Sequence, residues 1–273
     1  MRRPEQVTAV VFDWAGTTVD HGSLAPIRAL VQAFDSLGLD VPVAAARDGM
    51  GLAKRDHIAH LLASGPAREA FVESFGRAPN DADVDRVYGA FLPVQTAVIR
   101  EGGALISGVL DCVAELRTRG LRIGSTTGYT RPLLDALLET AARAGYVPDA
   151  AICPDDVGAG RPSPLMLYAN AVQLRRSPLS SFVKVGDTPA DIEEGRAAGT
   201  WSVGVAATGN EVGLDAAQLD ALSAEERDRV VGEARDRLCD AGADFVIDDL
   251  RGLPKVLDEI NERLAAGERP AIS

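Results

Sequence analysis

The sequence predicts an α/β protein whose core is a doubly wound parallel sheet, with an α-helical cap inserted after the first strand. Six short segments are continuously apolar, which is typical of strands buried on both faces of a parallel sheet. Helical patterns alternate with these segments, and such alternation favours right-handed crossover connections. The expected strands are 7–13, 121–125, 150–153, 182–185, 201–205 and 245–247.

Apolar residues at helical spacing predict three helices of the core. The first pattern stops at Gly120 and the second at Gly199, and glycine commonly follows the last residue of a helix. The patterns are Val109, Val113 and Leu116; residues 189–198; and Val256, Ile260 and Leu264. In Rossmann-like sheets of this kind ligands bind outside the carboxyl ends of the strands, so functional residues are expected there.

The interval 22–101 interrupts the alternation of strands and helices. Helical stripes at 27–37, around 61–62 and at 84–91 leave no segment that resembles a strand. About 80 helical residues directly after the first strand would cover the carboxyl end of that strand, with Gly22 and Gly102-Gly103 as hinges. The expected domains are an α/β core, 1–21 and 102–273, and a helical cap, 22–101.

The chain has 273 residues, a formal net charge of −12 and a sequence pI of about 4.8. Because an acidic protein repels nucleic acid and anionic lipid, neither is an expected partner. An anionic substrate would need a local cation or a metal to hold it. No apolar stretch reaches the roughly 20 residues of a membrane span. Three widely spaced cysteines predict no disulfide framework. We therefore expect a reduced cytoplasmic protein.

Polar clusters follow the expected strands. Asp13 opens the first, and a carboxylate at a strand end can attack phosphorus while backbone N–H groups bind the phosphoryl oxygens. Thr126, Thr127 and Gly128 offer hydroxyl and amide groups for the same purpose. Arg161 is a cation placed before a helix start. Taken singly, each of these is more often a solvated turn acid, a helix cap or a surface arginine.

Asp187 and Asp191 form a fourth cluster. Asp187 ends a strand and Asp191 lies four residues further on, so both carboxylates can face one point. A few hard oxygen ligands suit Mg²⁺, with waters and a substrate phosphate completing its octahedron. In isolation the same two acids could equally well cap a helix.

Together and in this order, the four clusters resemble the four motifs of the haloacid dehalogenase superfamily. The resemblance implies that Asp13 is a nucleophile that becomes transiently phosphorylated. It also implies that Thr127, Gly128 and Arg161 bind the substrate, with Thr127 chosen over Thr126 by alignment to the second motif. The groups implied to hold Mg²⁺ are Asp13, Asp187 and the Ala15 carbonyl, with Asp191 and Thr188 in support.

The position two residues after the nucleophile separates two kinds of reaction. Most phosphatases of the superfamily carry an aspartate there, which protonates the leaving alkoxide. Here the position is Ala15, which cannot transfer a proton. A general acid contributes roughly 10²–10⁴-fold in rate, so an ester phosphatase would lose that factor. A reaction that stabilises its leaving group in another way would lose nothing.

Lys54 could supply that stabilisation. Breaking a carbon–phosphorus bond leaves an electron pair on carbon, and a protonated imine between lysine and a neighbouring aldehyde accepts the pair as an enamine. Such a lysine must be partly neutral, so its pKa should be lowered by burial or by nearby cations. His57, one helical turn away, could act as a base or as polar support. Without a resemblance, Lys54 would usually be a solvated helix lysine.

Segments 12–20, 50–54 and 125–130 resemble the phosphonoacetaldehyde hydrolase (phosphonatase) family, and the likeness spans nearly the whole chain. The combination of Ala15 with Lys54 is its most specific part. The resemblance implies a Schiff base at Lys54, the products acetaldehyde and phosphate, and a homodimer formed through the cap.

Four further positions belong to this resemblance. Met50, His57 and Tyr129 match positions that the family places around the reacting centre. Ser23 stands where at least some members have cysteine, and we expect it to have a tuning role at most.

Two alternatives remain open. The first is a phosphate-ester phosphatase or phosphomutase of the same superfamily, against which Ala15 counts. The second is a non-catalytic binding or regulatory protein with the same fold, against which the presence of every motif residue counts. Segment 208–240 is predicted to be mostly charged helix, and the sequence assigns it no function.

Overall fold

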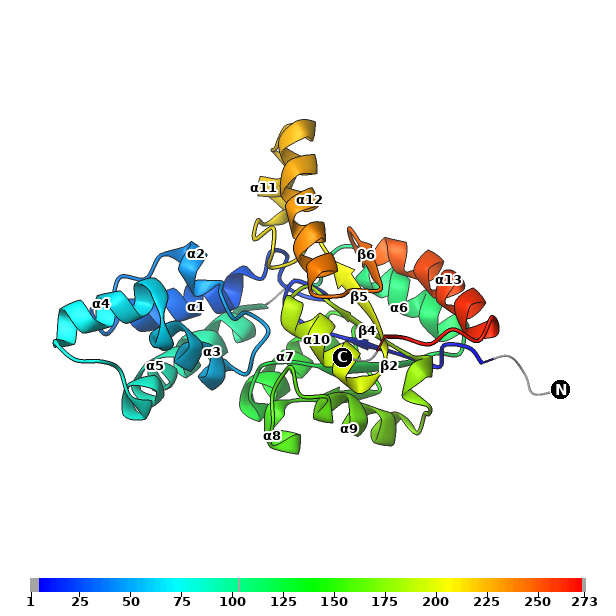
Figure 1. Cartoon of the computed structure of the whole chain (residues 1–273), viewed down its shortest axis with the longest axis horizontal. Coiled ribbons are helices and arrows are strands. Elements are labelled where there is room, and N and C mark those ends of the chain that lie inside the picture. The colour runs from blue at the N-terminus through cyan, green and yellow to red at the C-terminus, as the bar shows by residue number, and fades with distance from the viewer. Residues whose placement is uncertain (1–4, 103, 272–273) are drawn as a thin grey trace.

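The computed structural model describes residues 5–102 and 104–271 and contains a six-stranded parallel sheet (Figure 1). The strand order is β3-β2-β1-β4-β5-β6, in which the chain starts at the centre, builds one half and then returns to build the other. All six expected strands are present, so the predicted fold class is confirmed. They are β1 (Ala9–Phe12), β2 (Arg122–Thr126), β3 (Ala150–Ile152), β4 (Phe182–Gly186), β5 (Trp201–Val205) and β6 (Phe245–Ile247).

Helices connect the strands and follow the last of them. In chain order they are α1 (Leu24–Asp35), α2 (Val43–Ala46), α3 (Lys54–Ala63), α4 (Gly65–Phe75), α5 (Asp81–Gly102), α6 (Val109–Thr118), α7 (Arg131–Arg143), α8 (Pro154–Val157), α9 (Leu165–Leu174), α10 (Pro189–Ala198), α11 (Ala216–Asp220), α12 (Ala224–Asp240) and α13 (Leu253–Ala265). Two short 3₁₀ turns, Leu179–Ser181 and Leu250–Gly252, precede β4 and α13. The three predicted core helices are confirmed as α6, α10 and α13.

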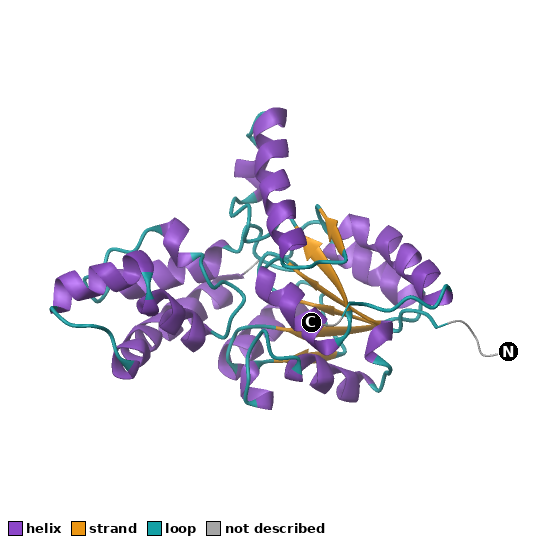
Figure 2. Ribbon diagram, viewed as in Figure 1, coloured by secondary structure: helices purple, strands orange, loops and turns teal. Residues whose placement is uncertain are grey.

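Alternate residues of the central strand β1 pack into different layers. Ala9 and Val11 belong to one apolar cluster with residues of α9, whereas Val10 and Phe12 belong to another with residues of α6 and α13. Successive side chains of a strand point to opposite faces, so helices cover both faces of the sheet (Figure 2). This double burial explains why the strands are apolar at nearly every position.

Helices α1 to α5 lie together at one end of the molecule, in the interval that we predict to be the cap (Figure 1). Helix α5 packs against α1 and also against α7 of the core, and it continues to Gly102, one residue beyond the predicted boundary. Gly22 has a φ of +82°, a conformation that favours glycine. Gly103, of the second expected hinge, lies outside the described residues. The division into core and cap stays a prediction.

The segment 208–240 contains α11 and α12, and α12 projects away from the sheet (Figure 1). A loop that runs from Thr208 to Leu214 precedes these helices. Among the described residues, no helix has both the length and the apolar composition needed to cross a membrane.

The three central strands place the predicted functional clusters side by side. Strand β1 pairs with β2 on one side and with β4 on the other, all in parallel, so their carboxyl ends share one edge. Phe12 at the end of β1 is opposite Ser125 and Val185. The residues that follow each strand therefore meet at this edge, which the cap helices face.

Candidate active site

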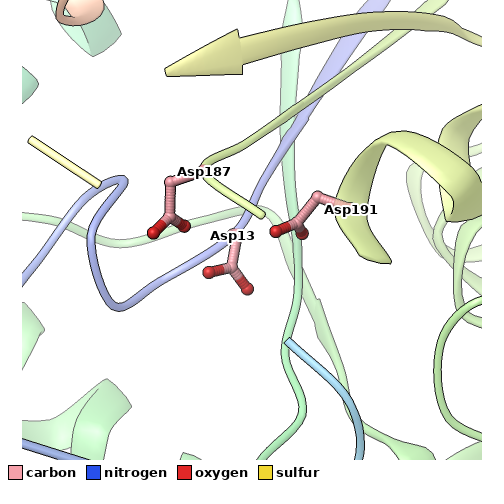
Figure 3. A group of neighbouring side chains, drawn as sticks. All are labelled: Asp13, Asp187 and Asp191. Carbon is pink, nitrogen blue, oxygen red and sulfur yellow. The ribbon is translucent and has the colours of Figure 1, made fainter. Parts of the chain in front are cut away.

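Three aspartates meet at the carboxyl edge of the sheet (Figure 3). Asp13 directly follows β1, Asp187 follows β4, and Asp191 lies in the first turn of α10. One carboxylate oxygen from each lies within 4.8 Å of the others, and all three side chains are buried. Thr188 caps α10 and donates its hydroxyl to Asp191 at 2.6 Å, which fixes that carboxylate at the helix start.

Asp187 is completely buried and accepts hydrogen bonds from the Thr17 hydroxyl at 3.0 Å and the Asn210 backbone N–H at 2.7 Å. Burial, with the nearby charges of Asp13 and Asp191, raises its pKa well above the usual value. Gly16 lies so close that a Cβ there would come within 2.1 Å of an Asp187 oxygen. Only glycine therefore allows the loop after β1 to pass this carboxylate.

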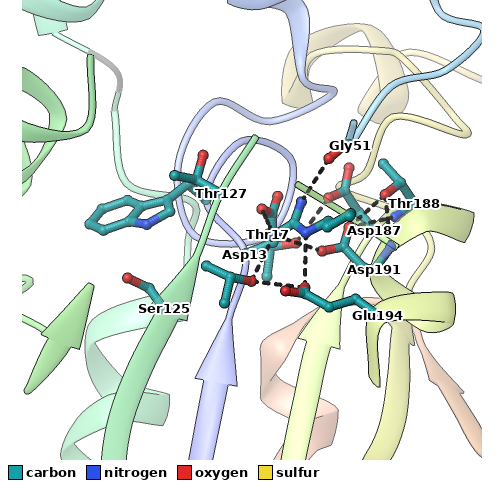
Figure 4. A network of polar contacts seen from close by, with 12 residues as sticks. Asp13, Thr17, Gly51, Ser125, Thr127, Asp187, Thr188, Asp191 and Glu194 are labelled. Carbon is teal, nitrogen blue, oxygen red and sulfur yellow. Dashed lines mark hydrogen bonds and ion pairs between the residues drawn. The ribbon is translucent and has the colours of Figure 1, made fainter. Parts of the chain in front are cut away.

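Arg161 connects three of the buried acids, Asp13, Asp191 and Glu194, whose carboxylates lie close together in Figure 4. Its Nη2 lies 2.6 Å from Asp13 and 3.1 Å from Asp191, and its Nε donates to Glu194 at 2.9 Å. Its Nη1 donates to the backbone carbonyl of Gly51 in the cap, at 3.3 Å. The guanidinium is 1% exposed, so these bonds operate away from water, where they are strong.

Lys184 and Glu194 belong to the same network, although we did not predict them from the sequence. Lys184 Nζ lies 2.8 Å from Asp191 and 3.2 Å from Glu194, and it donates to the Thr126 hydroxyl at 2.8 Å. A lysine within the otherwise apolar run of β4 and a glutamate one helical turn after Asp191 were the signals that could have identified them. Thr126 therefore holds the network, whereas Thr127 is the threonine that lines the cavity described below.

The net charge of this network is negative, which favours the binding of a divalent cation. Its four carboxylates belong to Asp13, Asp187, Asp191 and Glu194, and its two fixed cations to Arg161 and Lys184. With every group ionised the sum is −4 + 2 = −2, and Asp187 has no ion pair with a described residue. Buried carboxylates repel one another unless positive charge compensates them. These residues fit a hard cation such as Mg²⁺.

Lys54 approaches from the cap as the first residue of α3. Its side chain is buried, with Nζ 3.6 Å from the Met50 sulfur and 5.6 Å from the centre of the Tyr129 ring. Burial, the largest cause, and the charge of Arg161 lower its pKa to about 8, although Asp13 opposes this shift. A substantial fraction of this amine is therefore neutral near physiological pH.

His57 lies one turn after Lys54 and is also buried. Neither of its ring nitrogens has a hydrogen-bond partner among the described residues. Burial and the neighbouring Lys54 lower the pKa of His57 to about 3, so the imidazole is neutral at physiological pH. Tyr129 keeps its proton, because burial and the nearby carboxylates raise its pKa well above the usual value. The cap side of the site therefore carries little fixed charge.

One cavity brings the two sides together. It is lined by Asp13, Ala15, Ser23, Pro26, Met50, Gly51, Lys54, Thr127, Gly128, Tyr129, Arg161 and Thr188. Of the residues that we expected in the site, His57, Asp187 and Asp191 do not line this cavity. The cavity measures about 20 Å³, which is room for about one water molecule. Side chains of the surrounding residues therefore fill most of the space between the two sides.

Close backbone contacts hold the cap against the core. The Lys54 N–H donates to the Gly128 carbonyl at 3.1 Å, and a Cβ at Gly128 would come within 2.2 Å of the Leu52 carbonyl. A Cβ at Gly51 would come within 2.3 Å of the Thr188 hydroxyl. Glycine at these two positions lets the two loops approach far enough to bring the amine beside the acids.

Comparisons with known proteins identify the family of the chain. The family model of the haloacid dehalogenase-like hydrolases matches residues 7–199. Phosphonoacetaldehyde hydrolases from Syntrophobacter fumaroxidans and Paraburkholderia xenovorans are 42% and 43% identical to the chain; both matches cover 97% of it and 95% and 100% of the relatives. The crystal structure of a phosphonoacetaldehyde hydrolase-like protein from Oleispira antarctica superposes with a TM-score of 0.94, at 39% identity over 97% of this chain and 96% of that one. The chain therefore belongs to the phosphonoacetaldehyde hydrolase family of the haloacid dehalogenase-like hydrolases.

Proposed function

We propose that this enzyme hydrolyses the carbon–phosphorus bond of phosphonoacetaldehyde to acetaldehyde and phosphate, with Lys54 forming an imine and Asp13 accepting the phosphoryl group. The observation that carries the proposal is the buried Lys54 amine, which shares one cavity with Asp13. Ala15, in the same cavity, offers no proton to a leaving alkoxide. The activity named for the relatives agrees with this combination.

The first part of the reaction takes place on the cap residues. The neutral Lys54 amine adds to the aldehyde carbon, and loss of water gives a protonated imine. His57 lies one turn away and its imidazole is neutral, so it can accept a hydrogen bond from the intermediates, although a pKa of about 3 makes it a poor base at physiological pH. The Met50 sulfur and the Tyr129 ring pack beside the amine and help to exclude water, and this desolvation raises the free energy of the charged form.

The second part takes place on the core residues. An Asp13 oxygen attacks phosphorus, and the electron pair of the breaking carbon–phosphorus bond moves into the imine to give an enamine. Protonation of the enamine carbon and addition of water release acetaldehyde and free Lys54, and water cleaves the aspartyl phosphate. One water is consumed overall, because the water lost in imine formation is returned. Arg161 and Thr127 line the cavity with Asp13 and would hold the phosphoryl oxygens as charge develops on them.

Asp13, Asp187 and the Ala15 carbonyl would hold Mg²⁺, with Asp191 and Thr188 fixing the loop around them. When bound, the ion neutralises charge on the phosphoryl group and its acceptor. Asp191 already pairs with Arg161 and Lys184, whereas the donors to Asp187 among the residues that the structure describes are neutral, so Asp187 has the greater need of a cation.

The cavity of about 20 Å³ is too small to admit the substrate. We therefore propose that the cap moves away for substrate entry and returns to bring Lys54 to the phosphonate. Direct evidence would come from free and ligand-bound structures that differ in the position of α3. An amine that stayed out of bonding reach of a phosphoryl group at Asp13 in every state would contradict the mechanism.

Two further features belong to the proposal. A homodimer formed through the cap is implied by the family, and a groove along α1 that includes Leu24, Ile27 and Val31 offers apolar surface for it. A reducing cytoplasm suits the three free thiols, Cys112, Cys153 and Cys239, all of which lie in the described part of the chain.

Reductive trapping tests the proposal. Borohydride added with phosphonoacetaldehyde should inactivate the enzyme, and the mass of the adduct should map to the peptide that contains Lys54. Without the aldehyde, borohydride should have no effect. In parallel, acetaldehyde and phosphate should form in equal amounts, and only with Mg²⁺. Turnover of phosphate esters at matching rates, with no trapped adduct, would favour an ester phosphatase or phosphomutase instead.

A further inference from the structure

Arg47, at the end of α2, extends its guanidinium to oxygen acceptors of the expected hinge at Gly22 and of the 208–214 loop. Its Nη1 donates to the Gly22 carbonyl at 3.1 Å and to the backbone and side-chain oxygens of Asn210 at 3.3 and 2.9 Å. Its Nη2 donates to the Gly213 carbonyl at 3.1 Å. One half-buried guanidinium therefore connects the cap, the expected hinge and the 208–214 loop.

Glycines allow the acceptors of Arg47 to lie close to its guanidinium. Gly213 has a φ of +66°, and a Cβ there would come within 2.6 Å of the Arg47 Cζ. The hinge and the loop also contact each other directly, because the Gly22 N–H donates to the Thr208 carbonyl at 2.8 Å. A Cβ at Gly22 would come within 2.3 Å of the Leu214 carbonyl. Glycines at both places keep the carbonyls close enough for a single arginine to bridge them.

The same loop reaches the clustered carboxylates. Asn210, whose two oxygens accept from Arg47, donates its backbone N–H to Asp187 at 2.7 Å. Thr208 donates its hydroxyl to the Gly16 carbonyl at 2.8 Å, on the loop that passes Asp187. Both residues are buried. A displacement of Asn210 would therefore move one of the two donors that, in the described part of the chain, hydrogen-bond to the Asp187 carboxylate.

We propose that Arg47 is a positioning residue that locks the cap on the core and, through the 208–214 loop, orients Asp187 for cation binding. Closure then brings Lys54 into the site and aligns Asp187 by the same motion, because both depend on where residues 47–54 lie. The inference rests on the proposed function for its effect on turnover. Its effect on cation binding requires only the contacts described above.

The test compares Arg47→Met with the wild-type enzyme by calorimetric titration with Mg²⁺ alone, steady-state kinetics and thermal unfolding. Methionine keeps an aliphatic stem and removes the five N–H donors. We expect Mg²⁺ to bind about tenfold more weakly and kcat to fall at least about tenfold, as when an outer partner of a metal ligand is removed. Wild-type enzyme that does not turn over phosphonoacetaldehyde would refute the proposed function, whereas the titration would still decide the role of Arg47.

Arg237→Met is the matched control, because Arg237 comes from α12, pairs with Glu211 of the same loop at 3.1 Å and makes no ion pair with a described residue of the cap. It should leave Mg²⁺ affinity and kcat within twofold. Asn210→Ala removes one acceptor of Arg47 and keeps the N–H to Asp187, so it should weaken Mg²⁺ binding about threefold. In the double variant, adding Asn210→Ala to Arg47→Met should weaken Mg²⁺ binding no further than Arg47→Met alone.

A purely structural role predicts a different pattern. Arg47→Met would then lower the unfolding midpoint while Mg²⁺ affinity and kcat stayed within twofold of wild type, and this result would overturn the proposal. If Arg47→Met does not fold, Asn210→Ala decides the question alone: unchanged Mg²⁺ affinity overturns the proposal, and a threefold loss supports it.

Discussion

The chain has only three lysines among its 28 lysine and arginine residues, and the structure gives two of them opposite surroundings. Lys184, in the core, lies between Asp191 and Glu194 and is fully buried with them. Lys54, on the cap, is almost as deeply buried but has the Met50 sulfur and the Tyr129 ring as neighbours. Lys255, on α13, is exposed.

The difference between the two buried lysines follows from their partners rather than from their burial. Carboxylates within hydrogen-bond distance stabilise the ammonium of Lys184 and make it a fixed cation of the acid network. Burial without such a partner destabilises the ammonium of Lys54 and lowers its pKa to about 8. The core side of the cavity therefore carries fixed charges. The cap side carries an amine that is partly neutral, as its proposed role as a nucleophile requires.

Removing Asp13, the proposed nucleophile on the charged side, should have the largest effect. We expect Asp13→Asn to lower kcat by about 10⁵-fold, because the amide cannot form the phosphoryl ester, while the circular dichroism spectrum stays that of the wild type. Retention of more than a few per cent of activity would show that Asp13 is not the nucleophile.

On the uncharged side, Lys54→Arg tests whether an amine rather than a positive charge is needed. Arginine keeps a cation at this position but forms no imine under these conditions, so kcat should fall by roughly 10³–10⁴-fold and borohydride should no longer label the protein. Lys255→Arg is the matched control and should change neither. Equal turnover by Lys54→Arg would leave no basis for imine chemistry.

Lys184→Met should act on stability. It would leave Asp191 and Glu194 without one of their cations in a fully buried site, and loss of one partner from a buried ion pair costs about 3–5 kcal/mol. Chemical denaturation would measure the free energy of unfolding, with the exposed Lys255→Met expected to stay within about 0.5 kcal/mol of wild type. A small change for Lys184→Met would mean that Arg161 alone compensates these acids.

The pH dependence should report the lowered pKa of Lys54. Only the neutral amine attacks an aldehyde, so kcat/KM should rise with pH through a midpoint near 8 and increase about tenfold between pH 7 and 9. Enzyme kept intact over this range, shown by unchanged fluorescence, is the necessary control. A midpoint near 10.5, the ordinary lysine value, would show that the cap does not desolvate the amine.

The smallest effect is expected at Ser23, which is buried and lines the cavity near both sides. Ser23→Cys exchanges a hydroxyl for a thiol of similar size without altering the acids or Lys54. We expect kcat and KM to stay within about threefold of wild type. A change of more than tenfold in either constant would assign this position a direct part in the reaction.

Much of the fold and the site could be predicted because the signals are local. Strands buried on both faces are apolar at nearly every position, so segments such as Ala9–Phe12 stand out without knowledge of their neighbours. Residues directly after parallel strands must meet at one edge, which makes Asp13 and Asp187 recognisable from their places in the chain. The network partners Lys184 and Glu194 were missed because their significance depends on which residues they face.

The sequence by itself determined the alternating α/β core, the helical insertion and the reactive groups, since these follow from hydrophobic period and from residue type. Only the tertiary structure decided which buried lysine has carboxylate partners and which, in the described part of the chain, has none within hydrogen-bond distance. It also decided that Arg47 binds the 208–214 loop, since its hydrogen bond to Asn210 joins residues 163 positions apart in the chain. The physical reason is that side-chain type sets what a group can do, whereas the dielectric surroundings and the partners that set its charge state come from segments brought together by folding.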